Sequence, residues 1–268
     1  MTRGADESTA DRAVAVFGDD DAHDRVVAEL DEVDGIDVVR AAADPTRSLS
    51  GDPSAVVVDG VDALSALVCR ESDRGDDATS NTASGAFPPV IVLNGGTDVP
   101  SIPETDLPAT LDVVFERAAE TEYHRPVTVE VDDVSVTGLF DVAMVVDEPA
   151  TISAFEIRAG DSKLATLRAD GVVVATAAGS RRYANRIGVP QLSSTVDGVA
   201  VAPIAQFSIE KRHWIVDERE LRLRVVRDGA PVSVQVDGRV VTTVDSGTSV
   251  TVARESEVSL VRPIDGGN

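Results

Sequence analysis

The feature that most constrains the fold of this chain is a change of pattern near residue 121. Before it, short apolar runs at Arg12–Phe17, Ala55–Val58 and Val90–Leu93 alternate with segments whose apolar residues recur at helical spacing. After it, short strand-like stretches follow one another and are cut by Gly and Asp turns. The first pattern predicts an α/β domain with a small parallel sheet, and the second predicts a larger all-β, sandwich-like domain.

These patterns divide the chain into three parts. Residues 1–11 are expected to form a disordered tail, residues 12–120 the α/β domain, and residues 121–268 the all-β domain. Within the α/β domain, residues 71–86 are rich in Asp, Ser, Thr and Gly and offer little to bury, so they are expected to form a mobile loop. The segment from Leu107 to Ala119 has apolar residues at helical spacing and predicts an amphipathic helix.

The charge balance limits the partners of the chain. Lys and Arg total 24 against 47 Asp and Glu, which gives a net charge of −23, and the only lysines are Lys163 and Lys211. Nucleic acid is not an expected partner, because binding a phosphate backbone requires a basic surface. So acidic and lysine-poor a chain is typical of adaptation to high salt, where charges are screened over short distances.

Other residue counts narrow the class of protein further. No apolar run approaches the length of a membrane span and the first residues lack a signal-peptide core, so a cytoplasmic protein without a membrane partner is expected. Cys69 is the only cysteine, which excludes an internal disulfide. The three histidines, His23, His124 and His213, are too widely spaced to suggest a metal site.

One stretch of the second domain combines a strand with a glycine-serine turn. Residues Arg168–Tyr183 read R-A-D-G-V-V-V-A-T-A-A-G-S-R-R-Y. The β-branched run predicts a strand, and the small residues after it predict a turn that presents backbone donors and one aromatic ring. Such a turn is suited to holding a nucleotide.

This stretch resembles the NAD kinase family. Asp170-Gly171, Thr176, Gly179-Ser180, Tyr183 and Gly188-Val189-Pro190 follow the order and spacing of the family's motif in its C-terminal β domain. The resemblance implies an α/β domain followed by an all-β domain, with the active site between them and the tail returning to the first domain. It also implies NAD as substrate, ATP or polyphosphate as phosphoryl donor, Mg²⁺ or another divalent ion, and a homodimer or homotetramer.

Three further segments resemble the family more weakly. Val201–Ile209 is similar to its Thr-Pro-Ile-Cys-Pro-His-Ser-Leu segment, and Val236-Asp237-Gly238-Arg239 is similar to its Val-Asp-Gly-Gln turn. Asn94-Gly95-Gly96 is similar to its Asn-x-Gly stretch after a strand of the first domain.

The family's Gly-Gly-Asp-Gly motif, which supplies the carboxylate that accepts the hydroxyl proton, is altered here. If Asp59-Gly60 is the motif's own Asp-Gly, the carboxylate is retained and Val57-Val58 replace the glycines. If Asp59-Gly60 instead replaces the two glycines, Val61 takes the carboxylate position and the base is lost. We prefer Asp59 as the candidate base, with Asp62 behind it, although an Asp-Gly at a strand end is also an ordinary turn.

The resemblance also implies a set of nucleotide-binding residues. The family's Asn-acid pair corresponds to Phe140-Asp141, so the acid is kept and the amide is lost, and Phe140 either stacks on a base or fills the core. Arg181, Arg182 and Arg186 replace small residues of the family, and they either grip a phosphate or form a solvated face. The nucleotide-binding candidates are Gly60, Asp141, Asp170, Thr176, Gly179, Ser180, Arg181, Arg182, Tyr183 and Arg186.

The leading hypothesis is therefore an NAD kinase-like protein that phosphorylates the 2′-hydroxyl of NAD. The altered motifs leave a second hypothesis open, a catalytically silent nucleotide-binding homologue that acts as a sensor or as a partner of a true kinase. A third, less favoured, is a related small-molecule or lipid kinase, since such enzymes share the Gly-Gly-Asp-Gly type of domain.

Overall fold

The computed structural model describes residues 12–33, 35–40, 53–69, 88–148, 151–210, 212–217, 219–227, 229–255 and 257–264. The predicted disordered tail, residues 1–11, and the predicted mobile loop, residues 71–86, lie outside these residues. The chain divides into two compact units, the first formed by residues 1–67, 78–123 and 258–268 and the second by residues 68–77 and 124–257.

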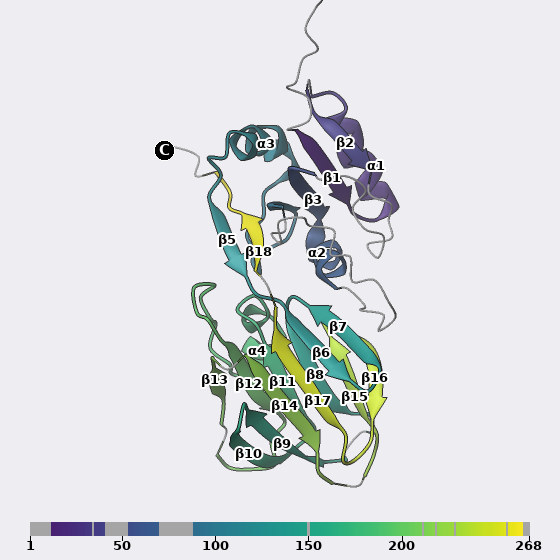
Figure 1. The fold of residues 1–268 in the computed structure, drawn as a ribbon, viewed down its shortest axis with the longest axis vertical. Helices are drawn as coiled ribbons and strands as arrows, with labels where there is room; N and C mark the ends of the chain where they lie inside the picture. Colours follow the sequence, from purple (N-terminus) through teal and green to yellow (C-terminus); the bar gives the residue numbers. More distant parts are fainter. Residues whose placement is uncertain are drawn as a thin grey trace, which may run out of the picture. The chain divides into compact units, whose positions relative to one another are not determined.

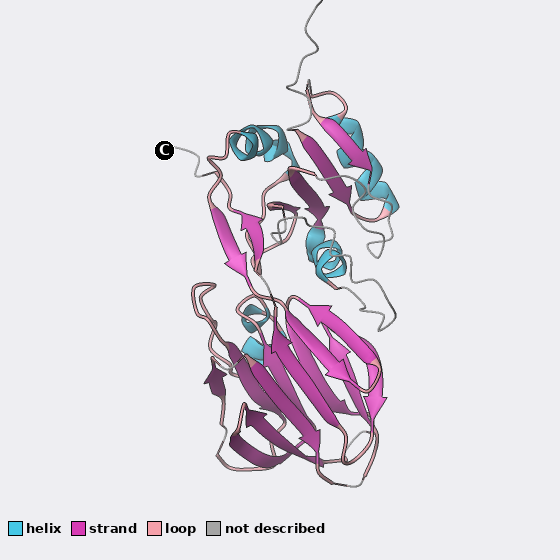
Figure 2. Ribbon diagram, viewed as in Figure 1, coloured by secondary structure: helices cyan, strands magenta, loops and turns pink. Residues whose placement is uncertain are grey.

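The first unit is an α/β unit built on a six-stranded sheet (Figures 1 and 2). The strands β1, β2, β3, β4 and β18 pair in parallel, and β5 lies at one edge in the order β2-β1-β3-β4-β18-β5. The elements of this unit are β1 (Ala13–Phe17), α1 (Asp20–Leu30), β2 (Asp37–Arg40), β3 (Ala55–Asp59), α2 (Gly60–Val68), β4 (Val90–Leu93), the short 3₁₀ helix η1 (Glu104–Asp106), α3 (Leu107–Phe115), β5 (Thr121–His124) and β18 (Val258–Val261).

Burial explains why this sheet forms in the centre of the unit. In β3 the side chains of Val56, Val57 and Val58 are fully buried, as are all those of β4. A strand that is apolar on both faces requires cover on both faces, which is the usual arrangement of a parallel sheet. The last strand of the chain, β18, completes the sheet by pairing with β4.

The predicted helix from Leu107 to Ala119 is shorter in the structure, where α3 ends at Phe115. Arg117 adopts a positive φ of 56°, and the amides of Arg117 and Ala118 donate to the carbonyls of Val114 and Val113. This is the hydrogen-bond pattern of a helix ended by a left-handed residue, with Arg where glycine is usual. Apolar spacing alone does not reveal such a stop.

The second unit is an antiparallel sandwich of two six-stranded sheets, ordered β10-β9-β14-β17-β6-β7 and β13-β12-β11-β8-β15-β16 (Figure 1). Its elements are β6 (Val127–Val131), β7 (Val134–Gly138), β8 (Asp141–Val146), β9 (Ser153–Ala159), β10 (Ser162–Ala169), β11 (Gly171–Ala175), the 3₁₀ helix η2 (Gly179–Arg181), α4 (Tyr183–Arg186), β12 (Val199–Ile204), β13 (Trp214–Val216), β14 (Glu220–Val225), β15 (Val232–Val236), β16 (Arg239–Val244) and β17 (Ser249–Arg254).

Alternating burial produces the core of the sandwich. In β9 every second side chain is buried, including Phe155 and Ile157, and in β14 Leu221, Leu223 and Val225 are buried between half-buried or exposed residues. Because successive side chains of a strand point to opposite faces, this alternation turns one face of each sheet inward. The expected fold class, an α/β region with a parallel sheet followed by an antiparallel β-sandwich, is confirmed.

Candidate functional site

The candidate base, Asp59, lies at the carboxyl end of β3, where the chain enters α2. The turn depends on Gly60, whose φ of 83° is costly for any residue with a side chain. The preferred sequence interpretation, with Val57 and Val58 in place of two glycines, corresponds to two fully buried strand residues just before Asp59.

The carboxylate of Asp59 is held from two sides. Its Oδ2 accepts a hydrogen bond from Nη2 of Arg25 at 2.7 Å, and its Oδ1 accepts one from Nδ2 of Asn94 at 2.9 Å. Nε of Arg25 also donates to both carboxylate oxygens of Glu104, at 2.9 Å each. The side chain of Asp59 is 14% exposed, so these contacts fix a nearly buried carboxylate.

A pocket of about 430 Å³ opens beside Asp59. Its lining comes from the segments that follow β1, β3 and β4, so it lies at the carboxyl edge of the parallel sheet. This edge is where α/β sheets usually bind ligands. The lining residues are Phe17, Gly18, Asp19, Asp59, Gly60, Val61, Asp62, Ala63, Ala66 and Asn94.

Carboxylates give this pocket its chemical character. Asp19 caps α1 by accepting a hydrogen bond from the amide of Ala22 at 2.9 Å, whereas Asp62 is exposed in the first turn of α2. Among the residues that the structure describes, the lining contains no Lys or Arg. A pocket of this composition favours hydroxyl groups or cations over a bare phosphate.

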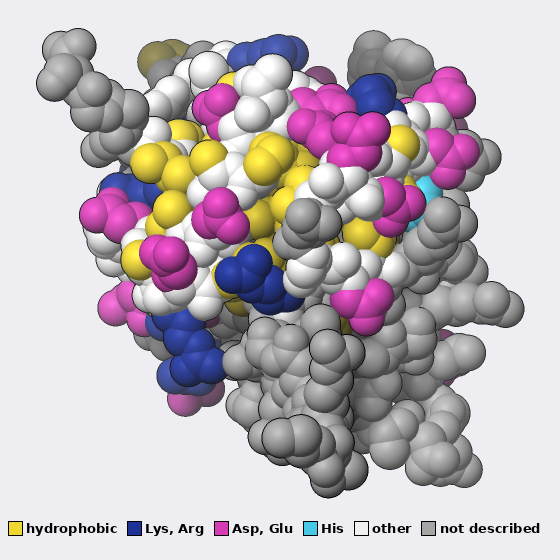
Figure 3. Space-filling view, turned by 90° about the horizontal axis from the view of Figure 1, so that it is seen from above, with side chains coloured by type: hydrophobic (Ala, Val, Ile, Leu, Met, Phe, Trp, Pro, Cys, Tyr) yellow, Lys and Arg dark blue, Asp and Glu magenta, His cyan; other side chains and the backbone are white. Residues whose placement is uncertain are grey.

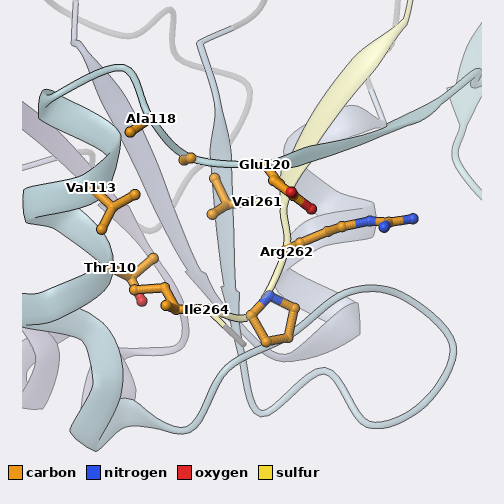
Figure 4. A pocket seen from close by; sticks show the side chains of 9 residues that line it. Thr110, Val113, Ala118, Glu120, Val261, Arg262 and Ile264 are labelled. Carbon is orange, nitrogen blue, oxygen red and sulfur yellow. The ribbon is translucent and has the colours of Figure 1, made fainter. Parts of the chain in front are cut away.

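A second pocket of the same unit, of about 180 Å³, has a different lining (Figure 4). It is formed mostly by aliphatic side chains of α3 and of the end of the chain, with Glu120 and Arg262 at its side. Among its described lining residues Glu120 is the one carboxylate and Arg262 the one basic group, and no strand-end Asp-Gly lies there, so we assign the candidate site to the pocket beside Asp59.

In the second unit, most of the predicted nucleotide-binding residues gather at one end of β8 and β11. Asp141 begins β8 and lies opposite Ala175 at the end of β11, and the turn from Thr176 to Arg186 follows at once. Tyr183 is 42% exposed at the start of α4, and Arg186 is exposed at its end.

Asp170 does not join this group. It precedes β11, whose first residue, Gly171, pairs with Val145 near the far end of β8. Four residues along a strand separate Val145 from Asp141, a distance of roughly 13 Å. The turn and Asp170 therefore lie at opposite ends of the same strand.

Three of the turn residues hold the turn itself. The hydroxyl of Thr176 donates to the carbonyl of Leu139 at 2.6 Å, and the amide of Gly179 donates to that hydroxyl at 3.2 Å. The hydroxyl of Ser180 donates to the carbonyl of Ala177 at 2.7 Å and accepts from the amide of Leu192 at 2.8 Å. Thr176 and Ser180 are buried, so their side chains shape the turn.

Phe140 is a core residue. Its side chain is 1% exposed, and the guanidinium of Arg182 lies 4.3 Å from the centre of its ring. Of the two readings of the sequence, the ring therefore fills the core, and one of its faces is covered by a cation. The residue that replaces the family's amide is thus paired with an arginine that replaces a small residue.

The pKa of the Asp141 carboxyl is raised. Burial and the nearby negative charge of Asp237 raise the pKa of the Asp141 carboxyl from 3.8 to about 6, while Arg182 acts in the opposite direction. At neutral pH a small but appreciable fraction of Asp141 is therefore protonated.

Sequence reasoning did not select Arg25, Glu104 or Asp237 as site residues. The turn containing Asp237 was recognised as similar to the family, and Asn94 as part of a short family-like stretch, but neither pattern indicates its partner. Arg25 has no local signal, because its contact with Asp59 joins positions 34 residues apart.

Two solved structures share the fold of this chain. A yeast NADH kinase complexed with NADH superimposes with a TM-score of 0.75 at 17% identity, covering 95% of this chain and 84% of the other. An NAD kinase from Archaeoglobus fulgidus in complex with ATP gives 0.69 at 20% identity and covers 93% of each chain. The chain shares its fold with these two kinases.

Sequence comparison finds related proteins for the second half of the chain. Residues 140–262 match the ATP-NAD kinase C-terminal domain. The NAD kinase of Methanosarcina barkeri is 35% identical over 104 residues, 38% of each chain, and that of Methanothermobacter thermautotrophicus is 27% identical over 155 residues, 56% of this chain and 54% of the relative. A little under half of this chain is therefore similar to the C-terminal domain of NAD kinases, and the chain aligns with only about a third to a half of the length of these relatives.

The part of the chain that the structure describes has no helix with both the length and the apolarity of a membrane span.

Proposed function

We propose that this protein binds NAD and ATP and transfers the terminal phosphoryl group of ATP to the adenosine 2′-hydroxyl of NAD, giving NADP and ADP. The observation that carries the proposal is the family match, which includes Asp141 and the whole turn from Thr176 to Arg186. The Asp59-Gly60 pair, with its pocket at the carboxyl edge of the parallel sheet, supports it from the first unit.

The residues of the first unit suit the proton-transfer part of this reaction. As the hydroxyl oxygen bonds to the phosphorus and the bond to ADP breaks, the hydroxyl proton passes to Asp59. Arg25 and Asn94 hold the carboxylate in a fixed orientation, and each of its oxygens keeps a further lone pair for that proton. The acid-rich pocket suits the ribose hydroxyl better than the phosphate groups.

A divalent ion is part of the proposal. Among the described residues no group of three or more His, Cys, Asp or Glu side chains is arranged to hold a metal ion. Mg²⁺ is commonly held by one or two carboxylates together with substrate phosphates. Asp59 and Asp62 would supply such carboxylates and ATP the remaining ligands, and the ion would offset the charge of the phosphates. A polyphosphate donor would supply phosphate ligands to the ion in the same way.

The arginines of the Thr176–Arg186 turn are proposed phosphate ligands. Arg181 and Arg182 are half-buried and Arg186 is exposed. Guanidinium groups bind phosphates through paired hydrogen bonds, which would be valuable in a protein of net charge −23. Arg182 also covers Phe140, so it would serve packing and ligand binding together.

The test is transfer of radiolabelled phosphoryl from ATP to NAD in molar salt, comparing the parent with Asp59→Asn. The parent is expected to form NADP and the variant to lose at least ~100-fold in rate, because the proton acceptor is gone. Asp112→Asn, on the exposed side of α3, is the matched control and should keep the parent rate. Equal rates for Asp59→Asn and the parent would refute the choice of base.

A specific observation favours the second candidate, a silent nucleotide-binding homologue. Both oxygens of Asp59 already accept hydrogen bonds, and buried valines replace the glycines that would let a phosphate approach the backbone. Calorimetric binding of NAD or ATP by the parent, with no NADP formed over many hours, would favour this candidate over the kinase.

A further inference from the structure

The segment Leu139–Asp141 is held by a single carboxylate. Oδ2 of Asp237 accepts a hydrogen bond from the amide of Leu139 at 2.9 Å. Its Oδ1 accepts from the amides of Phe140 and Asp141, at 2.7 and 3.0 Å. Three consecutive backbone donors thus converge on one side chain, an arrangement that binds an anion firmly.

Asp237 is itself rigidly placed. It occupies the turn between β15 and β16 with a φ of 49°, which Asp tolerates better than most residues. Its amide donates to the carbonyl of Asp141 at 2.9 Å, so backbone and side chain grip the same segment. Gly138 leaves room for this contact, because a Cβ there would lie 3.0 Å from Oδ1 of Asp237 and 2.4 Å from Cγ1 of Val236.

The opposite side of the Leu139–Asp141 segment is held by the Thr176–Arg186 turn. The hydroxyl of Thr176 donates to the carbonyl of Leu139 at 2.6 Å and its amide to the carbonyl of Phe140 at 2.9 Å. A Cβ at Gly179 would lie 1.9 Å from that carbonyl oxygen, so only glycine fits. The segment is therefore fixed between the turn and Asp237.

We propose that Asp237 is a positioning residue for dinucleotide binding: its carboxylate, bound to three consecutive amides, sets where Phe140 and Asp141 lie against the Thr176–Arg186 turn. This inference takes its ligand, NAD, from the proposed function and rests on it to that extent. It assigns a role to the hairpin at β15 and β16, which is 96 residues away from Asp141 in sequence.

The charges around Asp141 supply a readout of this contact. The groups that act on its carboxyl are Asp237, which raises its pKa, and Arg182, which lowers it. Replacing Asp237 by Asn removes the negative charge and turns one acceptor oxygen into an NH₂ group that faces an amide donor. The titration of Asp141 therefore reports whether the Asp237 carboxylate lies beside it, and NAD affinity reports whether that contact positions the binding residues.

The experiment is a ¹³C NMR titration of the Asp141 carboxyl in the full chain at high salt, assigned with Asp141→Asn, together with calorimetric titration of NAD. In Asp237→Asn the pKa of Asp141 should fall below about 6, while burial keeps it above 3.8. NAD affinity should fall about tenfold or more, because the amides that place Asp141 lose an acceptor. An unchanged pKa with unchanged NAD affinity would overturn the proposal.

Asp132→Asn is the matched control. Asp132 also has a φ of 49° in a two-residue hairpin turn, between β6 and β7 of the same unit, and it loses the same charge. The control should leave both the titration of Asp141 and the affinity for NAD as in the parent. Equal effects of the two substitutions would assign them to net charge and refute a specific role for Asp237.

A second variant keeps the test decisive if Asp237→Asn does not fold. Asp237→Glu retains the charge but is one methylene too long for the three amides, so NAD affinity should fall while the pKa of Asp141 stays raised. Parent affinity in Asp237→Glu would overturn the proposal. Failure of the parent to bind NAD would refute the proposed function alone, and the NMR titration would still decide whether Asp237 governs Asp141.

Discussion

Asp141 shows how a single residue acquires properties that its neighbours in sequence do not confer. Its carboxyl is largely buried at the start of β8, close to the carboxylate of Asp237 and to Arg182. Burial and a like charge both disfavour ionisation, and together they exceed the effect of the arginine. The sequence predicted an acid at this position but not an acid with a raised pKa.

Asp141 should make stability depend on pH in a definite direction. Its pKa is 3.8 when unperturbed and about 6 in the folded protein, so the folded state binds the proton more tightly. The stabilisation is fully present below pH 4 and is lost as pH rises through about 6, at most roughly 3 kcal/mol. We expect the parent to lose free energy of unfolding relative to Asp141→Asn between these pH values, as measured by urea denaturation in high salt. A constant difference between the two proteins would contradict the assignment.

At the scale of elements, the turn between β11 and α4 depends on close backbone packing. The carbonyl of Phe140 accepts a hydrogen bond from the amide of Thr176, which brings β8 against Gly179. The sequence motif of small residues was predicted to present donors to a ligand, and the structure shows in addition why two of its members must be small or hydroxylated. Thr176 and Ser180 use their hydroxyls within the turn.

Substitution of Gly179 should therefore be severe. Gly179→Ala would bring a Cβ within 1.9 Å of the Phe140 carbonyl oxygen, and no flexible side chain can move aside. We expect a loss of at least ~3 kcal/mol in free energy of unfolding, seen as a large drop in melting temperature. Gly229→Ala is the control, because its Cβ would meet nothing within 4 Å. Similar melting temperatures for the two variants would show that β8 can shift to make room.

In the first unit, the parallel order of the strands places the candidate base beside its partners. Arg25 from α1 and Asn94, just after β4, bond to Asp59 at the end of β3, and Glu104 from η1 binds Arg25. The parallel order of β1, β3 and β4 brings their carboxyl ends to one edge, so residues far apart in the chain meet there. The Asp-Gly pair and the Asn94 stretch were visible in the sequence, whereas the contacts of Asp59 with Arg25 and Asn94 were not.

At the scale of the whole molecule, charge is the dominant feature. Acidic side chains are spread over the face seen in Figure 3, around a group of hydrophobic side chains. With a net charge of −23, their mutual repulsion opposes the compact state. We propose adaptation to high salt on this basis, since the screening length falls from about 10 Å at 0.1 M salt to about 3 Å at 1 M.

Thermal unfolding should accordingly depend strongly on salt. We expect the melting temperature to rise by on the order of 10 °C between about 0.1 M and about 2 M KCl, as repulsion among carboxylates is screened. Sucrose of similar osmolality is the control, because it does not screen charge and should reproduce only a part of the rise. A melting temperature that is constant or falls with KCl would contradict the proposed adaptation.

The amino-acid sequence alone determined the two kinds of architecture, the position of the glycine-serine turn and the candidate base Asp59. These follow from local periodicity, turn chemistry and a family-like order of residues, all of which lie within short stretches of chain. Only the tertiary structure decided that Asp237 holds Leu139–Asp141, that Arg25 holds Asp59, and that Asp170 lies at the far end of β11 from the turn. The physical reason is that such contacts depend on strand order and register, which join residues that no local pattern connects.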